Sequence, residues 1–576
     1  MMRNKKTNKS WEGENIMQEN TVVQETTSVN PGQLSGQKIA PVVEKPDSVW
    51  TKRMKEHFNF FGPVTFLYAV FYAFCMFHNG SGVTFPFFLA GTLLYFVFSL
   101  SKLEITLKKG STFYMISILL LGVSTFCTDG WAIIGLNKLA VFLLVMCLLL
   151  NQYFDTKKWN LGKYVGSICQ LVVMSFGELG KPFSDGKAYF REKGKVNKKV
   201  WYGLLGVVIA LPILLIAAGL LSSADAVFRK MTVDFMNWIR PGNVFNVVIR
   251  VTFLFFASYA LTSYLCKRSI PEEVKDRRKG EPVLAITIMS LLSLLYLLFS
   301  GIQIFGLFLG KMQLPEGYTY AQYAREGFFQ LLAVSILNLI LVLVCLSFFR
   351  ESKVLKVIMT IMSLCTFIMI ASSVMRMIIY IRYYYLTFLR IFVLWMLAVL
   401  FVMFIGVLIN IYRESFPLFR YGVVMVTVLY LALSFSHPDY IIARVNIANA
   451  PGADGTGWEE SVAQDYGDDF FAGPFFRGSE YNDYSYLSDL SADAAPVIIP
   501  YMESLGYDFG AYELENPTDI MSEDTQAQWW GSYQPKGFGY YYLNHNKKRL
   551  DQTSLRTFNI SRYMARKQIE ARIDGK

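Results

Sequence analysis

The chain is poor in charge and in the residues that build metal and redox sites. Charged residues make up 17% of its 576 residues, whereas soluble domains are about a quarter charged. The seven cysteines include no C-x-x-C pair, and the four histidines are widely separated. These absences argue against a zinc site, a histidine metal cluster and a disulfide framework. We therefore expect neither a metal nor another cofactor.

The sequence also lacks the signatures of several membrane activities. It has no P-loop, which argues against an ATP-driven pump, and no Ser/His/Asp or Cys/His set emerges for nucleophilic catalysis. No Asp or Glu lies in the interior of an apolar run, where ion-coupled transporters usually place acids. The acidic stretch from Asp454 to Asp469 lacks the ligand pattern of an EF-hand loop. We expect a protein that is not an enzyme. A solute transporter or permease is the first alternative, and an enzyme for a lipid-linked substrate is the second.

What the chain does contain is a series of long apolar runs. Hydrophobic residues make up 53% of it, and a run of about 20 is enough for a helix to cross a bilayer. The sequence therefore predicts an all-α polytopic membrane protein with about eleven transmembrane helices and a small extracytoplasmic C-terminal domain. The segment 165–176 is too short to cross and is expected to be re-entrant or interfacial. The predicted spans are 61–78, 83–101, 112–130, 131–150, 201–222, 243–265, 282–310, 327–349, 354–375, 389–411 and 418–436.

The placement of lysine and arginine predicts the orientation of these spans. With the N-terminus in the cytoplasm, the inner loops carry 24 Lys/Arg and the outer segments carry eight. Because the net charge of +11 is placed mainly on inner loops, we expect the lipid bilayer and not nucleic acid as the partner. The predicted parts are a disordered cytoplasmic tail (1–56), N-terminal transmembrane helices (57–150), a basic cytoplasmic loop (151–200), a C-terminal transmembrane bundle (201–436) and an extracytoplasmic domain with a basic terminal helix (437–576).

Opposite charges separate within the region after residue 437. Residues 451–530 hold seventeen Asp/Glu and one basic residue, whereas residues 535–576 hold ten Lys/Arg and three acids. Two arrangements are open: the two halves pair within one small domain, or the basic end returns to anionic lipid headgroups. The segment from Asn559 to Arg566 begins with helix-capping residues and is expected to be helical.

The segment 376–390 is predicted to lie on the outer side but still carries three arginines, although basic residues otherwise favour the inner loops. Arginines at a membrane boundary are costly without partners, so this stripe is a candidate functional site. The alternative is an aromatic belt whose arginines reach the lipid headgroups. Helical spacings of three and four place five polar residues on one face: Arg376, Tyr380, Tyr384, Thr387 and Arg390.

Two neighbouring segments are placed to complete that surface. Glu326 is the acid nearest to any span and is a candidate partner for an arginine of the stripe, unless it is only a helix-start glutamate favoured by the helix dipole. Arg444 and Asn446 emerge just beyond the last span, where a linker helix is the alternative. Asn338 is expected to hydrogen-bond between helices. The polar residues within predicted spans are Lys138, Arg250, Gln303 and Asn338.

Three blocks of the sequence occur together in a known family. They are Tyr323-Ala-Arg325-Glu326-Gly327-Phe328-Phe-Gln330-Leu331, Arg376…Tyr380…Tyr384…Leu386-Thr387…Arg390 and Ile442-Ala443-Arg444-Val445-Asn446. With 484–496 and 558–562, they resemble a bacterial family of multi-pass membrane proteins built around a domain of unknown function, over roughly 200–576. One departure is Tyr385, where the family pattern implies a glycine. The resemblance implies a bacterial cytoplasmic membrane protein, and it implies no established activity.

The candidate residues together favour a ligand site at the outer leaflet. Arginine forks suit phosphate or carboxylate groups, and tyrosines suit sugar or headgroup surfaces. We therefore expect a sensor or assembly factor that recognises or handles an anionic lipid or a cell-envelope precursor. The competing explanation is that Glu326 pairs with an arginine only to hold helices together; protein partners are unknown. The expected ligand-binding residues are Glu326, Arg376, Tyr380, Tyr384, Thr387, Arg390, Arg444 and Asn446.

Overall fold

The computed structural model describes most of its second compact unit, which runs from Asp47 to Lys576. The described residues are 48–156, 159–192, 241–272, 278–305, 320–448, 483–507, 509, 535–551 and 554–574, with isolated positions between 210 and 231. Within these ranges the regular structure is helical, and the one β-bridge joins Gly280 to Phe349. Residues 1–47 lie outside the described part. The tail predicted to be disordered was given the bounds 1–56, but residues 49–56 form helix α1.

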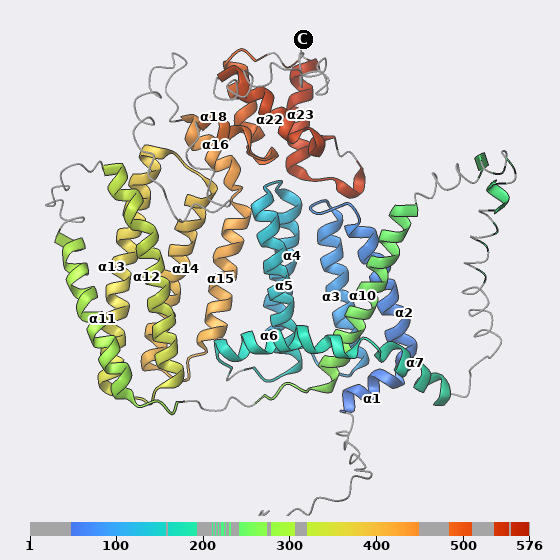
Figure 1. Ribbon diagram of the computed structural model, residues 1–576, viewed down its shortest axis with the longest axis horizontal. Coiled ribbons are helices and arrows are strands. Elements are labelled where there is room, and N and C mark those ends of the chain that lie inside the picture. The colour runs from blue at the N-terminus through green and yellow to red at the C-terminus, as the bar shows by residue number, and fades with distance from the viewer. Residues whose placement is uncertain are drawn as a thin grey trace, which may run out of the picture. The chain divides into compact units, whose positions relative to one another are not determined.

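One group of helices is formed by the first half of the chain (Figure 1). It packs around a single apolar core that includes Phe61, Leu89, Ile118 and Leu144. Glycines allow close approach at two crossings, because a side chain at Gly91 would meet Phe71 and one at Gly122 would meet Leu89. The helices are α1 (Val49–Glu56), α2 (Phe58–Met76), α3 (Thr84–Lys102), α4 (Ser111–Cys127), α5 (Trp131–Tyr153) and α10 (Pro241–Lys267).

The second half of the chain forms a neighbouring group of helices (Figure 1). Its core is rich in methionine, with Met289, Met359, Met362 and Met369 buried between the helices. Asn338 donates to Thr366 Oγ1 at 3.0 Å, so it joins two helices as predicted. The helices are α11 (Pro282–Gln303), α12 (Tyr320–Phe348), α13 (Lys353–Tyr384), α14 (Phe388–Tyr412) and α15 (Leu418–Phe435).

Polar side chains hold the two groups together where α15 lies beside α4 and α5. Asn137 Oδ1 accepts hydrogen bonds from the hydroxyls of Tyr430 and Ser434, each at 2.7 Å. The hydroxyl of Ser124 also donates to the carbonyl of Ser434 at 2.9 Å. In hydrocarbon such interhelical bonds each contribute only about 1 kcal/mol. Because these bonds are directional, their main effect is to fix how the two groups are oriented.

Nine of the described helices are long and apolar enough to cross a membrane, so the chain is a membrane protein. The apolar helix α4 is shorter, with 17 residues. Ten of the predicted spans coincide with these helices. The predicted span 201–222 lies almost entirely outside the described residues, and the total of eleven stays a prediction.

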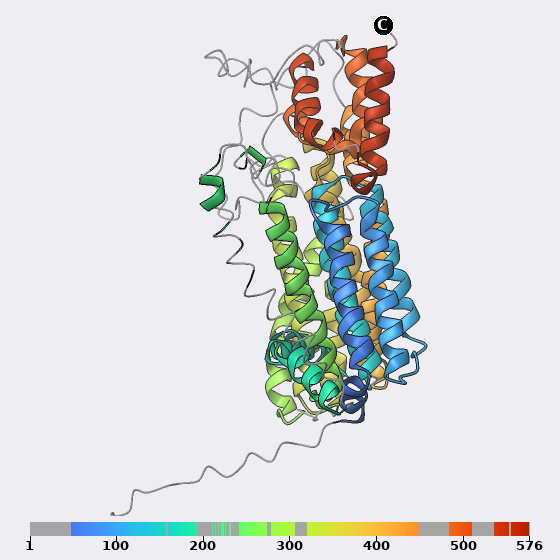
Figure 2. The same cartoon turned by 90° about the vertical axis from the view of Figure 1, so that its right-hand side faces the viewer.

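The membrane helices run between two ends of the bundle and so separate two sides of the protein (Figures 1 and 2). The C-terminal helices lie at one end of the bundle, which we call the cap side. Helices α1, α6 (Leu161–Ser175) and α7 (Lys181–Glu192) lie at the other end. The predicted segment 165–176 belongs mainly to α6, which lies across the helix ends and does not cross the bundle (Figure 1). Glu178 follows it and forms an ion pair with Lys267 of α10.

Candidate functional site

The chain beyond α15 folds into a group of short helices that we call the C-terminal cap. Apolar side chains from all parts of it form one core, which includes Ile442, Leu487, Ile499, Leu543 and Ile569. The cap consists of α16 (Pro438–Ala448), α18 (Asp483–Ser488), η4 (Ala492–Ala494), α19 (Ala495–Ser504), α22 (Pro535–Leu550), η6 (Leu555–Thr557) and α23 (Ile560–Asp574). The predicted helix at 559–566 is thus present in α23.

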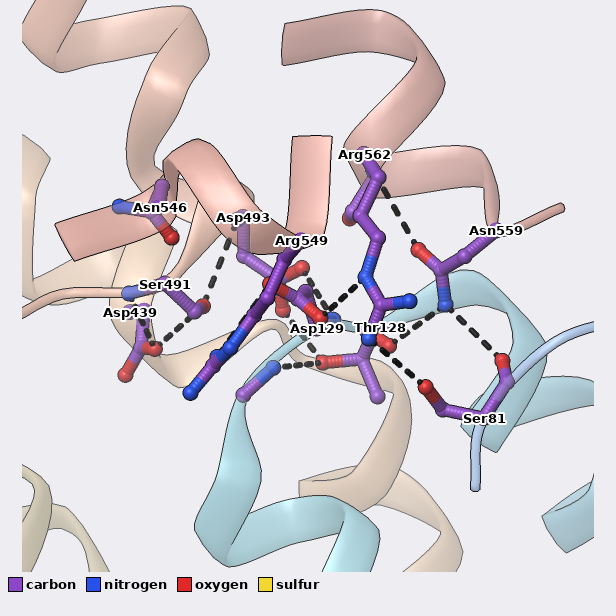
Figure 3. Close-up of polar contacts among 12 residues, drawn as sticks. Ser81, Thr128, Asp129, Asp439, Ser491, Asp493, Asn546, Arg549, Asn559 and Arg562 are labelled. Carbon is purple, nitrogen blue, oxygen red and sulfur yellow. Dashed lines mark hydrogen bonds and ion pairs between the residues drawn. The ribbon is translucent and has the colours of Figure 1, made fainter. Parts of the chain in front are cut away.

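The cap meets the membrane helices through a buried polar cluster (Figure 3). At its centre is Asp129, which lies between α4 and α5 and has a fully buried side chain. Arg562 donates from Nε to Asp129 at 2.7 Å, and Arg549 Nη1 lies 3.4 Å from the same carboxylate. A buried carboxylate is tolerated only when it is paired and hydrogen-bonded. We call these residues, together with Asp439 and Asp493, the junction cluster.

Asp493 extends the junction cluster through three described donors. It accepts a hydrogen bond from the hydroxyl of Thr128, another from the backbone N–H of Asp129 at 2.7 Å, and it contacts His437 Nδ1 at 3.3 Å. Burial favours the neutral acid, but the hydrogen bonds from His437, Ser561 and Thr128 outweigh it and lower the pKa of Asp493. The same contact with Asp493 raises the pKa of His437. Asp493 is therefore held as an anion beside a histidine that gains a proton readily.

Asp439 has the opposite titration behaviour in the same cluster. One of its oxygens, Oδ2, accepts from both the backbone N–H of Ser491 at 3.2 Å and its hydroxyl at 2.6 Å. The pKa of Asp439 is raised from 3.8 to about 6, mainly by burial and in smaller part by the charges of Asp493 and Asp129, although the bonds from Ser491 act to lower it. The cluster thus contains a carboxyl group that changes its charge close to neutral pH.

This raised pKa predicts how the Asp439→Asn substitution depends on pH. A pKa raised by folding means that stability is lost as the pH rises from about 4 through 6, because the folded protein must then hold an unfavourable anion. Asparagine can accept both bonds from Ser491 without that charge. We expect the variant to unfold at a higher temperature than wild type at pH 7.5, by an amount equivalent to about 1–2 kcal/mol, and to match it near pH 4. Thermal unfolding in detergent at both pH values measures this difference, and an equal loss of stability at both would contradict it.

The cap is also attached to the connection between α2 and α3. Asn559 Nδ2 donates to the carbonyls of Ser81 and Thr128 at 3.1 and 2.9 Å. The N–H of Val83 donates to the carbonyl of Phe558 at 2.8 Å. Gly82 must lack a side chain, because a Cβ there would overlap the backbone of Arg556. The cap therefore contacts the ends of four membrane helices at once.

The described ion pairs show where part of the charge of the C-terminal region is used. Arg572 pairs with Glu503 at 2.9 Å, which joins the basic end to the acidic half of the region. Arg549 and Arg562 instead pair with Asp129 at the membrane helices. The residues 451–482 lie outside the described part. Basic residues of the C-terminal end are thus shared between the cap and the bundle.

The predicted stripe is found on the cap side of the second helix group. Arg376 in α13 is only 6% exposed, and its Nη2 lies 3.4 Å from Gln303 Oε1 of α11. Its guanidinium lies directly over Gly327 of α12, where any side chain would overlap it. Ser372 donates to the same Gln303 oxygen at 2.7 Å. Arg376 thus joins three helices.

Arg390 of α14 lies against Tyr380, which is on α13 with Arg376. Arg390 is 3% exposed, and its guanidinium carbon lies 4.2 Å from the ring centroid of Tyr380. It also donates to the carbonyl of Tyr385. On the far side of Tyr380 lies Phe328, with the ring centroids 6.0 Å apart. The structure therefore brings Arg376, Tyr380 and Arg390 into one region, between α12, α13 and α14.

A sharp turn between α13 and α14 completes this region. Tyr385 has φ 62° and ψ −178°, a conformation that is essentially restricted to glycine. The glycine implied at this position is thus explained by the backbone, although this chain has tyrosine there. Asn446 of α16 holds the next residue, because its Oδ1 accepts from Leu386 N at 2.8 Å and its Nδ2 donates to Leu386 O at 3.0 Å. Thr387 is the N-cap residue of α14, and its side chain makes no capping bond.

The remaining predicted site residues are not brought into the stripe by any described contact. Arg444 is exposed on α16. The backbones of Glu326 and Tyr384 belong to α12 and α13, but their side chains lie outside the described part. The expected ion pair between Glu326 and an arginine therefore stays a prediction. Among the described residues, no group of three or more His, Cys, Asp and Glu is arranged to hold a metal ion.

Residues 115–501 match the model of a family described as Domain of unknown function (DUF4153). The chain belongs to the DUF4153 family. No curated protein and no solved structure matches it.

The DUF4153 match contains the whole stripe but only part of the junction cluster. All of the stripe lies within 115–501, as do Asp129, Asp439 and Asp493. The arginines that neutralise Asp129 lie beyond it, at 549 and 562. The match begins before the resemblance noted from the sequence and ends before the 558–562 block. The DUF4153 region thus supplies the acids of the junction cluster, and the following segment supplies the bases.

The junction cluster was missed from the sequence for a clear reason. Asp129 falls at the edge of the predicted span 112–130, and its partners are more than 400 residues away along the chain. The available signal is the short connection Thr128-Asp129-Gly130, a lone acid between two apolar runs. Such an acid requires a cationic partner. The basic C-terminal end lies on the same predicted side and contains lysines and arginines that could pair with it.

Proposed function

We propose that this DUF4153 protein recognises an anionic lipid or a lipid-linked cell-envelope precursor at the outer leaflet of a bacterial cytoplasmic membrane. In this proposal the cap side faces outward and the N-terminus lies in the cytoplasm. The protein acts as a sensor or an assembly factor, without catalysis of its own.

The observation that carries the proposal is the burial of two arginines at the cap-side end of membrane helices. Charged side chains among membrane helices are rare and usually mark functional sites, which supports a binding role for Arg376 and Arg390. Their planar donors suit phosphate or carboxylate groups, which they can bind with two parallel hydrogen bonds. The ring of Tyr380 packs against the guanidinium of Arg390 and so helps to orient it.

Covalent continuity and hydrogen bonds connect this region to the cap, which supports a sensing role. Arg390 holds the carbonyl of Tyr385, and Asn446 of α16 holds both backbone groups of Leu386. The hydroxyl of Tyr486 in α18 accepts from the N–H of Phe388 at 2.9 Å. A ligand that draws Arg390 away from Tyr385 therefore acts directly on two cap helices. This is a route by which binding in the membrane changes the cap.

The test is the lipid that co-purifies with the protein, identified by mass spectrometry and expressed per mole of protein. We expect wild type to retain an anionic lipid or lipid-linked precursor, and Arg390→Ala to lose most of it at an unchanged membrane level. Arg566→Ala is the matched control, because it removes an exposed cap arginine that pairs only with Glu570 among the described residues. Unchanged retention by Arg390→Ala, with a lower amount of protein in the membrane, would show that this arginine only holds the helices together.

A further inference from the structure

Three cationic side chains from three separate elements surround the connection between α2 and α3. Lys138 of α5 has its Nζ 3.1 Å from the position that a Cβ on Gly80 would take. The guanidinium carbon of Arg250 in α10 lies 5.8 Å from the ring centroid of Phe77. Arg556 of η6 donates to the carbonyl of Phe74, in the last turn of α2, at 3.1 Å. Three positive charges are thus collected around this connection.

Two of these cations lie well inside membrane helices. Lys138 is in the second turn of α5, and Arg250 is six residues after the start of the candidate span Val244–Lys267. At 1.5 Å per residue, Lys138 lies about 10 Å from the start of α5 and Arg250 about 14 Å from the start of α10. Both side chains are exposed, and neither is paired with a carboxylate among the described residues. Such a cation is tolerated when its long side chain reaches up to the lipid headgroups.

The cap contributes an apolar surface at the same level. Leu555 is 89% exposed, and Tyr563 and Met564 are each about half exposed. Leu555 is in η6, which is tied to the α2–α3 connection by bonds that include the one from Asn79 Nδ2 to the carbonyl of Arg556 at 2.9 Å, whereas Tyr563 and Met564 are in α23. Phe74 of α2 is also exposed, and its carbonyl accepts the bond from Arg556, so exposed apolar side chains of η6 and α2 lie near the same connection.

We propose that this surface, the α2–α3 rim, binds the headgroup of an anionic phospholipid of the surrounding bilayer. Lys138 and Arg250 supply positive charge from the bundle, and Arg556 supplies it from the cap. Leu555 enters the interfacial layer beside them. Because the cations belong to both parts, a bound phospholipid stabilises the attachment of the cap to the membrane helices. The rim lies on α2, α3, α5 and α10, whereas the stripe of the proposed function lies on α12, α13 and α14, so the two sites are independent.

The experiment compares the full-length protein in nanodiscs of phosphatidylcholine with and without phosphatidylglycerol. We expect phosphatidylglycerol to raise the unfolding temperature of wild type, and native mass spectrometry to show retained phosphatidylglycerol. The double variant Lys138→Gln/Arg250→Gln should lose most of both effects. The double variant Lys138→Arg/Arg250→Lys, with the same charges, should keep them. Equal retention of phosphatidylglycerol by wild type and the glutamine variant would overturn the proposal.

Two further variants keep the test decisive. Leu555→Ser changes only an exposed side chain, and we expect it to reduce the protection that phosphatidylglycerol gives to η6 in hydrogen exchange. Unchanged protection would contradict the role of this residue.

Arg390→Ala separates the rim from the stripe, because it should leave the phosphatidylglycerol effects intact. If Arg390→Ala abolishes them and the glutamine variant does not, the anionic lipid binds at the stripe and the rim proposal is wrong.

Discussion

Asp129→Asn should release the C-terminal cap from the membrane helices. The substitution keeps the size of the side chain and removes the charge that neutralises Arg562 and Arg549. Removing one partner of a buried ion pair leaves the other charge uncompensated, which costs about 3–5 kcal/mol. We expect rapid tryptic cleavage in α23 and fast hydrogen exchange in α22 and α23, whereas these helices resist both in wild type.

A second substitution distinguishes loss of this ion pair from general damage. Arg562→Gln removes the charge that Asp129→Asn leaves unpaired, so the double variant should recover part of the lost stability. Glu503→Gln is the matched control, because its ion pair with Arg572 is on the surface and such pairs contribute less than about 1 kcal/mol. A double variant that is as unstable as the sum of the two single changes would contradict the pairing described here.

Asn446→Leu should have the second largest effect, and it acts at the turn below the cap. Leucine has a similar size but cannot bond to the backbone N–H and carbonyl of Leu386, both of which Asn446 satisfies. A buried polar group without a partner costs about 1–3 kcal/mol, so we expect a loss of about 2–4 kcal/mol. The unfolding temperature in detergent and the exchange rate of the amide of Leu386 measure it.

The matched control for this turn is on the same helix. Arg444 is exposed on α16, and Arg444→Ala should leave the unfolding temperature nearly unchanged. If Asn446→Leu were as mild as this control, the turn would be held by something other than Asn446. Because Tyr385 has a conformation suited to glycine, local strain makes the support from Asn446 more important.

The membrane helices could be predicted because their signal is local. An apolar run of sufficient length predicts a span without any knowledge of its neighbours, and ten of the predicted segments coincide with apolar helices. The helical spacing of Arg376 and Tyr380 likewise placed them on one face. The sequence did not show that Arg390 would stack on that same tyrosine from the next helix, since this depends on the turn at Tyr385.

The junction cluster could not be predicted, because its residues are adjacent only after the whole chain has folded. Asp129 and Arg562 come from opposite ends of the chain, and Asp439 and Ser491 are separated by residues outside the described part. Asn446 was expected to face a ligand, but its amide oxygen and nitrogen both bond to the backbone of Leu386. An asparagine near a turn looks the same in the sequence whether it binds a ligand or hydrogen-bonds to the backbone of the turn.

The accessibility of the cap from outside the cell tests the central claim most directly. Single cysteines would be introduced by Ser504→Cys on the cap and Lys353→Cys on the opposite side, after replacement of the seven native cysteines. Both positions are exposed. With a membrane-impermeant maleimide on intact cells, the proposal predicts labelling at 504, and labelling at 353 only after permeabilisation. Labelling at 353 with protection at 504 would place the stripe and the cap in the cytoplasm and contradict recognition at the outer leaflet.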